Sequence, residues 1–126
     1  MLPRTFVIYG RPVSKKNSHR PRRGKSGWFV GNSRVYLRWA RDAEVQLATQ
    51  RVGQSPIPPD VHLHADVVVY LAKRQRMDGD NALGAPFDAL QAGGVITNDN
   101  QIKSHSYTER RDWDNPRIEI ALRRGF

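Results

Sequence analysis

The chain has 126 residues, of which 21 are Lys or Arg and 12 are Asp or Glu, so its formal charge at pH 7 is +9. This length fits a single domain over 1–126, and the positive charge favours a polyanionic partner, nucleic acid first, over a membrane. The lack of cysteine excludes a disulfide scaffold, a thiolate zinc site and a cysteine nucleophile, and it agrees with a reducing cytoplasm. No apolar run reaches the length of a membrane span, and the N-terminus does not predict a signal peptide.

The N-terminal part of the chain is expected to form a strand followed by a long basic loop. Residues 5–10 are a short β-prone run. Residues 11–27 mix Gly, Pro, Ser and Asn with basic residues, and seven bases fall between Arg11 and Lys25 without an acid. This composition indicates an exposed DNA-binding loop, because phosphates stabilise clustered positive charge. Its expected DNA-binding side chains are Lys15, Lys16, Asn17, Arg20, Arg22, Arg23 and Lys25.

A helix is expected from Asn32 or Ser33, either of which can cap it, to about Arg51. Apolar residues at helical spacing form one face of this helix. They are Tyr36, Trp39, Ala40, Ala43 and Leu47. A connector rich in Gly and Pro, 53–60, then leads into 61–72, whose apolar content is typical of a central strand.

The second half of the chain is expected to contain one helix and three strands. The helix covers 80–91, and Pro86 indicates that it starts late or kinks. The strands cover 95–96, 102–107 and 117–122. The order β, loop, α, β, α, β, β predicts a two-layer α+β domain, with two main helices packed on one face of a small mixed sheet.

Carboxylates gather in one part of this basic chain. The segment 77–102 contains no Lys or Arg but four aspartates, Asp78, Asp80, Asp88 and Asp99. Asp78 and Asp80 follow the expected central strand and, being two residues apart, can point the same way. Asp99 joins them if the short strand before it lies beside the central one.

Three carboxylates in a basic protein predict a divalent metal site. A hard cation relieves their mutual repulsion, and oxygen ligands select Mg²⁺ or Mn²⁺. In a metal-dependent nuclease the metal activates water while basic residues hold the flanking phosphates. The alternative is structural: Asp78 and Asp80 are turn residues, and Asp80 caps the next helix. For Asp88, a solvent-facing position and a supporting contact to the metal ligands both stay open.

The acidic residues belong to three motifs with a recognisable order. They are Asp78-Gly79-Asp80-Asn81, Phe87-Asp88-Ala89-Leu90 and Val95-Ile96-Thr97-Asn98-Asp99-Asn100-Gln101. With Gly10-Arg11-Pro12-Val13-Ser14-Lys15-Lys16-Asn17 near the N-terminus, this pattern resembles the RusA-type Holliday junction resolvases, a family of crossover junction endodeoxyribonucleases.

The resemblance implies both an activity and a set of site residues. The activity is Mg²⁺-dependent cleavage of four-way DNA junctions in recombination and repair. It would be carried out by a small α+β homodimer on nucleoid DNA, without membrane attachment and with phage or prophage associations. The catalytic and metal-binding carboxylates would be Asp78, Asp80 and Asp99. The residues supporting them would be Asn81, Asp88 and Gln101.

Two positions depart from the family pattern. Gly84 stands where the family usually has a lysine, and Asn98 stands where it often has an acid. The first change removes a positive charge from the active site. Replacement cations near the acidic segment are Lys73, Arg74, Arg76 and Lys103. The last two are also expected to bind DNA. Two alternatives stay open: a junction-binding protein with an inactive nuclease site, and a basic RNA-binding protein without a metal.

Overall fold

The computed structural model describes residues 2–14, 19–24, 27–32, 34–77 and 82–125, the side chains of 19–24 and 27–32 excepted. In chain order the elements are β1 (Arg4–Tyr9), β2 (His19–Gly24), β3 (Gly27–Asn32), α1 (Arg34–Gln50), β4 (Leu63–Leu71), α2 (Gly84–Ala92), the 3₁₀ helix η3 (Asp99–Gln101), β5 (Ile102–Arg111) and β6 (Arg117–Arg124). None of the described helices is long and apolar enough to cross a bilayer.

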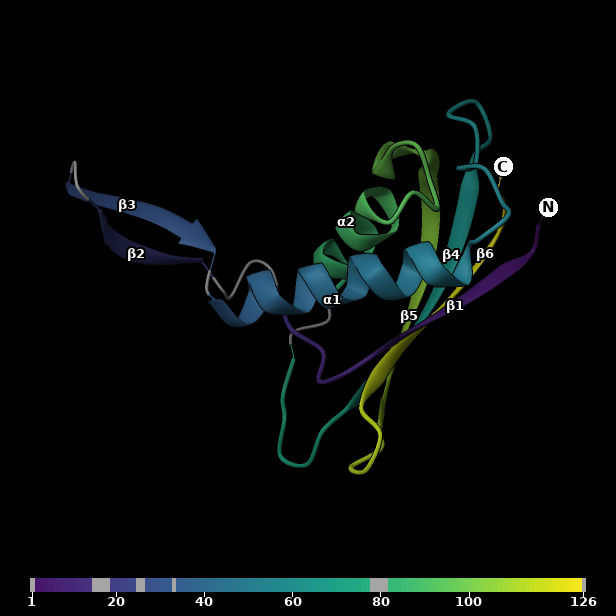
Figure 1. Cartoon of the computed structure of the whole chain (residues 1–126). Helices are drawn as coiled ribbons and strands as arrows, with labels where there is room; N and C mark the ends of the chain where they lie inside the picture. Colours follow the sequence, from purple (N-terminus) through teal and green to yellow (C-terminus); the bar gives the residue numbers. More distant parts are fainter. Residues whose placement is uncertain (1, 15–18, 25–26, 33, 78–81, 126) are drawn as a thin grey trace.

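The main sheet has four strands in the order β1-β6-β4-β5. β6 pairs antiparallel with both β1 and β4, whereas β4 and β5 are parallel, so the sheet is mixed. A parallel pair needs a crossover connection, and α2 lies within it. Both helices cover the same face of the sheet (Figure 1). The predicted α+β fold, two helices on one face of a small mixed sheet, is therefore confirmed.

Alternating burial along the strands builds the core between the sheet and the helices. Every second residue of β4 is buried, from Leu63 to Leu71. The register places Val67 of β4 beside Ile120 of β6, which in turn pairs with Phe6 of β1. The face of α1 expected from its spacing closes this layer. Its buried residues are Tyr36, Trp39, Ala43 and Leu47, with Ala40 packed at the margin.

Two glutamines of α1 bind the outer edge of β1. Oε1 of Gln50 accepts from the Val7 amide at 2.9 Å, and its Nε2 donates to the Val7 carbonyl at 2.6 Å. Gln46 makes the same pair of bonds with Tyr9, at 2.7 and 3.0 Å. Residues four apart share one side of a helix, so the pair matches backbone groups two residues apart on the strand. This edge is thereby closed to pairing with another strand.

The basic segment 11–27 differs from the continuous loop expected from the sequence. β2 and β3 pair antiparallel as a separate two-stranded sheet. Their hairpin projects beyond the N-terminal end of α1, away from the main sheet (Figure 1). Gly, Pro and basic residues lower the strand propensity of 19–24, but backbone pairing with the β-prone segment 27–32 overrides it. The loop prediction is therefore wrong for the backbone of 19–24.

The neighbourhood of the central strand also differs from expectation. β4 ends at Leu71, so the six residues 72–77 separate it from the acidic segment. The expected strand at 95–96 reduces to one isolated parallel bridge, between Ile96 and Ile57. The bridge partner of Ile96 therefore belongs to the connector before β4 and not to β4 itself. Asp99 was expected to join the other carboxylates if the short strand lay beside the central one, and that condition is not met, because the bridge forms with the connector.

α2 begins later than its expected start at residue 80. Its first residue is Gly84, and Pro86 lies in its first turn. Proline is tolerated there because the amides of the first turn have no partner within the helix. The late start predicted from Pro86 is therefore confirmed. β5 in turn continues to Arg111, four residues beyond the expected strand end at 107.

Candidate active site

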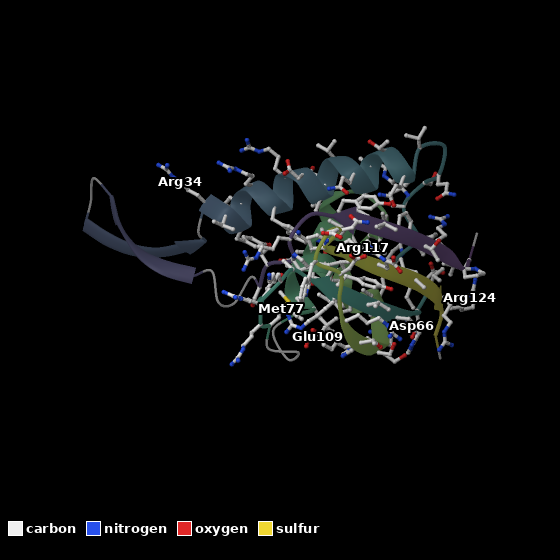
Figure 2. The ribbon with its side chains drawn as sticks, turned by 90° about the horizontal axis from the view of Figure 1, so that it is seen from below. Arg34, Asp66, Met77, Glu109, Arg117 and Arg124 are labelled. Atoms are coloured by element: carbon white, nitrogen blue, oxygen red, sulfur yellow. The ribbon has the colours of Figure 1, made fainter. Side chains whose placement is uncertain are left out.

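The chain leaves β4 at one end of the main sheet before it reaches the D-x-D segment. Met77, the last described residue before 78–81, lies near Glu109 of β5, and Asp66 and Arg124 lie toward the opposite end (Figure 2). The residues of the motif that lie outside the described ranges are Asp78, Asp80 and Asn81. Their role in a metal site stays a prediction.

Asp99 lies at the other end of the sheet, on η3 immediately before β5 begins. Asn98 caps η3, because its Oδ1 accepts from the Asn100 amide at 2.9 Å. The Asp99 amide donates to Oε1 of Gln91, in the last turn of α2, at 3.0 Å. These bonds hold the backbone, whereas the Asp99 carboxylate is exposed and has no hydrogen-bond donor among the described residues. Asn98, a departure from the family pattern, keeps the capping function that an aspartate would also perform.

The buried side chain of Gln101 joins η3 to a distant connector. Its Oε1 accepts from the amides of Thr97 and Asn98, at 2.8 and 3.0 Å. Its Nε2 donates to the carbonyls of Pro58 and Val61, at 2.6 and 3.0 Å. The amide therefore has no capacity left for a metal or a phosphate. Gln101 acts as a positioning residue that holds η3 in place.

Asp88 lies on the side of α2 that faces α1. Its side chain is half-buried, and it lines a groove between the two helices. The residues of α1 in this groove include Tyr36, Arg41 and Glu44. Asp88 is therefore at the margin of the helical layer, and its two expected positions, facing solvent or supporting the metal ligands, both stay predictions.

The cations expected to replace the family lysine fall in two places, because Lys73, Arg74 and Arg76 follow β4 whereas Lys103 is near the start of β5. Arg76 is exposed next to Met77, past the end of β4. Lys103 is exposed at the start of β5, close to Asp99 in the sequence. Gly84 is exposed at the start of α2, and a Cβ there would meet no atom within 4 Å. Arg76 and Lys103 thus lie toward opposite ends of the parallel pair β4 and β5, and the sheet does not bring these two cations together.

A groove with a positive lining opens beside Met77; we call it the basic groove. Its walls are the residues after β1, the first half of α1 and the segment 75–77, and it encloses about 750 Å³. Its described lining residues include three arginines, Arg11, Arg38 and Arg76, and one acid, Asp42. Such a concave surface with a net positive charge attracts phosphate. The sequence did not indicate that Arg38 would face the same space as the loop after β1.

The buried side chain of Gln75 joins two walls of the basic groove. Its Nε2 donates to the Pro12 carbonyl, 63 residues away in the sequence. Its Oε1 accepts from the backbone amide of Ala72 at 3.0 Å. The backbone amide of Gln75 donates to the Ala72 carbonyl at 3.1 Å, which closes the turn between them. Sequence reasoning missed this residue, whose only signal is a neutral side chain within a run of bases.

Arg117, at the start of β6, is already engaged by neighbouring side chains. Arg117 binds Glu119 and Asp112, each at 2.8 Å, and lies over the Tyr70 ring at 3.8 Å. The hydrogen bonds to Glu119 and then to Asp112 raise the pKa of Arg117. This guanidinium is therefore part of the sheet surface and is not free to bind a phosphate.

A polar cluster covers the face of the sheet opposite the helices. Asp66 accepts from Ser106 at 2.6 Å and contacts His64 at 2.8 Å, with Arg123 at 3.5 Å. Nδ1 of His64 lies 2.7 Å from the Ser104 hydroxyl. The hydrogen bond from Ser106, and after it the bond to His64, lowers the pKa of Asp66. These bonds tie β4 to β5 and β6.

The other residues expected to bind DNA are only partly placed. Lys15, Lys16, Asn17 and Lys25 lie outside the described residues. Arg20, Arg22 and Arg23 belong to β2, of which the backbone alone is described. Their contact with DNA stays a prediction, now attached to a projecting hairpin.

Two comparisons with known proteins agree with the motifs. A family model described as Endodeoxyribonuclease RusA matches residues 10–123, from the loop after β1 to near the end of β6. The Crossover junction endodeoxyribonuclease RusA of Aquifex aeolicus (strain VF5) is 33% identical over 92 residues, which cover 72% of this chain and 68% of that protein. The region matched by the family model includes the basic segment and all the acidic motifs.

Proposed function

This chain belongs to the RusA family of endodeoxyribonucleases, and on that premise we propose that it resolves four-way DNA junctions by hydrolysing phosphodiester bonds during recombination and repair. It is an endonuclease of the Holliday junction resolvase type, and the family match over 10–123 is the observation that carries this assignment. The relative from A. aeolicus is named for crossover junctions, so branched DNA is the substrate class. An RNA-binding function without a metal has no support in this membership.

Nucleases of this type generally depend on a divalent metal, and we propose Mg²⁺, with Mn²⁺ as a substitute. Its proposed ligands are Asp78, Asp80 and Asp99. The exposed Asp99 carboxylate, without a donor in the described ranges, fits a hard cation, because such ions take oxygen ligands. A bound divalent ion would activate water and neutralise charge at the phosphate. The proposed task of Asn81 and Gln101 is to keep these carboxylates in place.

The basic groove is proposed to hold the strand that is cut. Arg11, Arg38 and Arg76 line it. Arg11 and Arg38 would bind flanking phosphates and so fix the position of the phosphodiester, and Arg76 would in addition supply the positive charge that the family lysine provides. Arg76 is two residues from Asp78 in the sequence, so a phosphate bound to it lies close to the acidic segment. The projecting β2–β3 hairpin would extend this surface along a DNA arm.

We also propose that the protein acts as a homodimer. A four-way junction offers two equivalent strands, and paired cuts need two sites related by a two-fold axis. Leu37 and Val45 of α1 are 49% and 62% exposed, and a partner would remove such apolar side chains from water. Sedimentation at micromolar concentration should therefore show a dimer. A species of 14.4 kDa that still makes paired cuts would contradict this proposal.

Gly84 favours a second candidate, a protein that binds junctions without cutting them. One assay separates the two: a synthetic four-way junction and a linear duplex of the same arms, each with Mg²⁺ or with EDTA. We expect preferential binding of the junction in both buffers and paired cuts in the junction with Mg²⁺ alone. Junction binding without cleavage in Mg²⁺ or Mn²⁺ would support the second candidate. Equal binding of junction and duplex would contradict both.

A further inference from the structure

A second cationic surface adjoins the basic groove at Arg76, and it contains an exposed tryptophan. Lys73, Arg74, Arg76, Arg111 and Trp113 line an open depression of about 560 Å³ past the ends of β4 and β5. We call these five residues the Trp113 patch. The indole of Trp113 is 60% exposed. A large apolar ring left in water beside four cations suggests a ligand that has both an apolar face and negative charge.

Backbone contacts hold the cationic part of the patch in one shape. The Gln75 amide closes a turn on the Ala72 carbonyl at 3.1 Å. Arg74 lies within this turn at a φ of 63°, a left-handed conformation that few residues other than glycine adopt. Nη1 of Arg111 donates to the carbonyls of Gln75 and Ala72, at 2.7 and 3.3 Å. The exposed side chains of the turn therefore project from a backbone that β5 anchors.

Lys73 and Trp113 form a pair within the patch. Nζ of Lys73 lies 5.0 Å from the centroid of the Trp113 ring, a cation–π contact that orients the indole. The neighbouring acid Asp112 is engaged by Arg117 at 2.8 Å. Asp114 is the remaining acid beside the ring in the sequence, and four cations outnumber it. The described residues that line the Trp113 patch therefore carry a net positive charge.

We propose that the Trp113 patch binds an unpaired nucleotide of branched DNA, with Trp113 stacked on the base and Lys73 and Arg74 on the adjacent phosphates. Bases within a continuous duplex are stacked on both faces, so the indole needs a base that has left the stack, as where a pair opens at a branch point. The cations alone would attract any polyanion, whereas the exposed ring adds a preference for single-stranded character. This inference rests on the proposed junction function and names the part of the substrate that the surface recognises.

The position of the patch relates it to cleavage. Arg76 lines both the Trp113 patch and the basic groove. A strand that leaves the basic groove past Arg76 therefore meets the patch next. A base held there would place the branch point of the junction at a fixed distance from the acidic segment. The patch would thus select branched over continuous DNA.

The test measures binding in EDTA, where no metal-dependent cleavage takes place. Fluorescence anisotropy gives the dissociation constants of fluorescein-labelled oligo(dT) and of a linear duplex for the wild type, Trp113→Ala, Trp113→Phe and Arg124→Ala. Stacking is worth about 1–3 kcal/mol per base, so Trp113→Ala should weaken oligo(dT) binding about 5- to 160-fold. It should change duplex binding less than about twofold, and Trp113→Phe should retain most of the affinity. Arg124→Ala, an exposed change at the opposite end of the sheet, is the matched control.

Intrinsic fluorescence supplies a second readout, which does not depend on whether Trp113→Ala folds. The difference in emission between the wild type and Trp113→Phe isolates Trp113 from the other two tryptophans, and oligo(dT) should quench it. Equal losses on oligo(dT) and duplex, or quenching that persists undiminished in Trp113→Phe, would overturn the proposal. Junction cleavage by the wild type is scored separately. A wild type that binds oligo(dT) through Trp113 but cuts nothing would remove the proposed function and leave this site standing.

Discussion

Replacing Gln101 by alanine should lower the free energy of unfolding by about 3 kcal/mol. The side chain is 3% exposed and makes four hydrogen bonds shorter than 3.1 Å. Each such bond contributes about 1 kcal/mol, and a partner left buried without a bond costs more. Water can replace the hydrogen bonds lost by the amides of Thr97 and Asn98, which are exposed residues. It replaces the bonds lost by the carbonyls of Pro58 and Val61 less readily. For a domain of this size, the change lowers the midpoint of thermal unfolding by about 10 °C.

The same substitution should lower cleavage beyond its effect on stability. Gln101 holds η3, and η3 carries Asp99, so the carboxylate loses its fixed position while the rest of the fold stays intact. At a temperature well below the unfolding midpoint, cleavage of a four-way junction should fall at least about tenfold. Junction affinity in EDTA should not change, because Gln101 has no atom free to contact DNA. Urea denaturation and a gel-based cleavage assay measure the two effects.

Two variants serve as controls for Gln101→Ala. Gln91→Ala removes only the bond to the Asp99 amide, so it should cost less than about 1 kcal/mol and lower cleavage less. Gln101→Glu keeps the acceptor but turns a carboxylate oxygen toward the carbonyls of Pro58 and Val61, so it should not restore stability. A Gln101→Ala protein within about 0.5 kcal/mol of the wild type would refute the energetic argument. Full cleavage by a destabilised variant would instead remove Asp99 from the site.

Further substitutions test the carboxylates, the missing charge and the sheet surface. Asp80→Asn and Asp99→Asn should each lower cleavage by orders of magnitude in a junction gel assay, because an amide is a poor Mg²⁺ ligand, while junction affinity in EDTA stays equal or rises. Arg76→Ala should slow cleavage about 100-fold and weaken DNA binding much less. If Arg76→Ala cleaves at the wild-type rate and Gly84→Lys cleaves faster, then the chain lacks a cation that replaces the family lysine. The lowered pKa of Asp66 contributes stability that is present at neutral pH and lost as pH falls below 3.8. Its carboxylate side chain is 41% exposed; urea unfolding of Asp66→Asn should therefore show a deficit of only about 0.5 kcal/mol at pH 7 that shrinks as the pH falls below 3.8.

Local sequence patterns predicted the fold where each element is decided by its own residues. The apolar spacing from Tyr36 to Leu47 specified both α1 and its buried face. The strand-like run 117–122 predicted β6, and Pro86 predicted the late start of α2. The β2 strand was missed because its sequence is basic and contains proline, and pairing with β3 supplies what propensity does not.

The candidate site was harder to predict, because distant contacts shape it. β4 stops at Leu71 because a turn follows, and that turn depends on the bond from Gln75 to Pro12, 63 residues away. Asp99 reaches the sheet through η3, whose position depends on contacts with residues 57–61. The sequence did identify Asp99 as a candidate ligand, from its motif. The assembly of Asp78, Asp80 and Asp99 into one site, like the cytoplasmic location, stays a prediction.

The placement of buried polar groups connects the fold to the proposed chemistry. Among the residues that the structure describes, the buried polar side chains are those of Gln75 and Gln101. Gln75 is three residues before Asp78 and Gln101 is two residues after Asp99, so each flanks one half of the acidic pattern. A buried amide destabilises a core unless it is fully hydrogen-bonded, and both of these bond to segments more than 40 residues away. Apolar core positions tolerate exchange of one aliphatic side chain for another of similar volume. These two amides do not, because no other side chain offers both donors and acceptors at the same reach. Substitutions at Gln75 and Gln101 should therefore disturb cleavage more than size-conserving changes in the apolar core that cost equal stability.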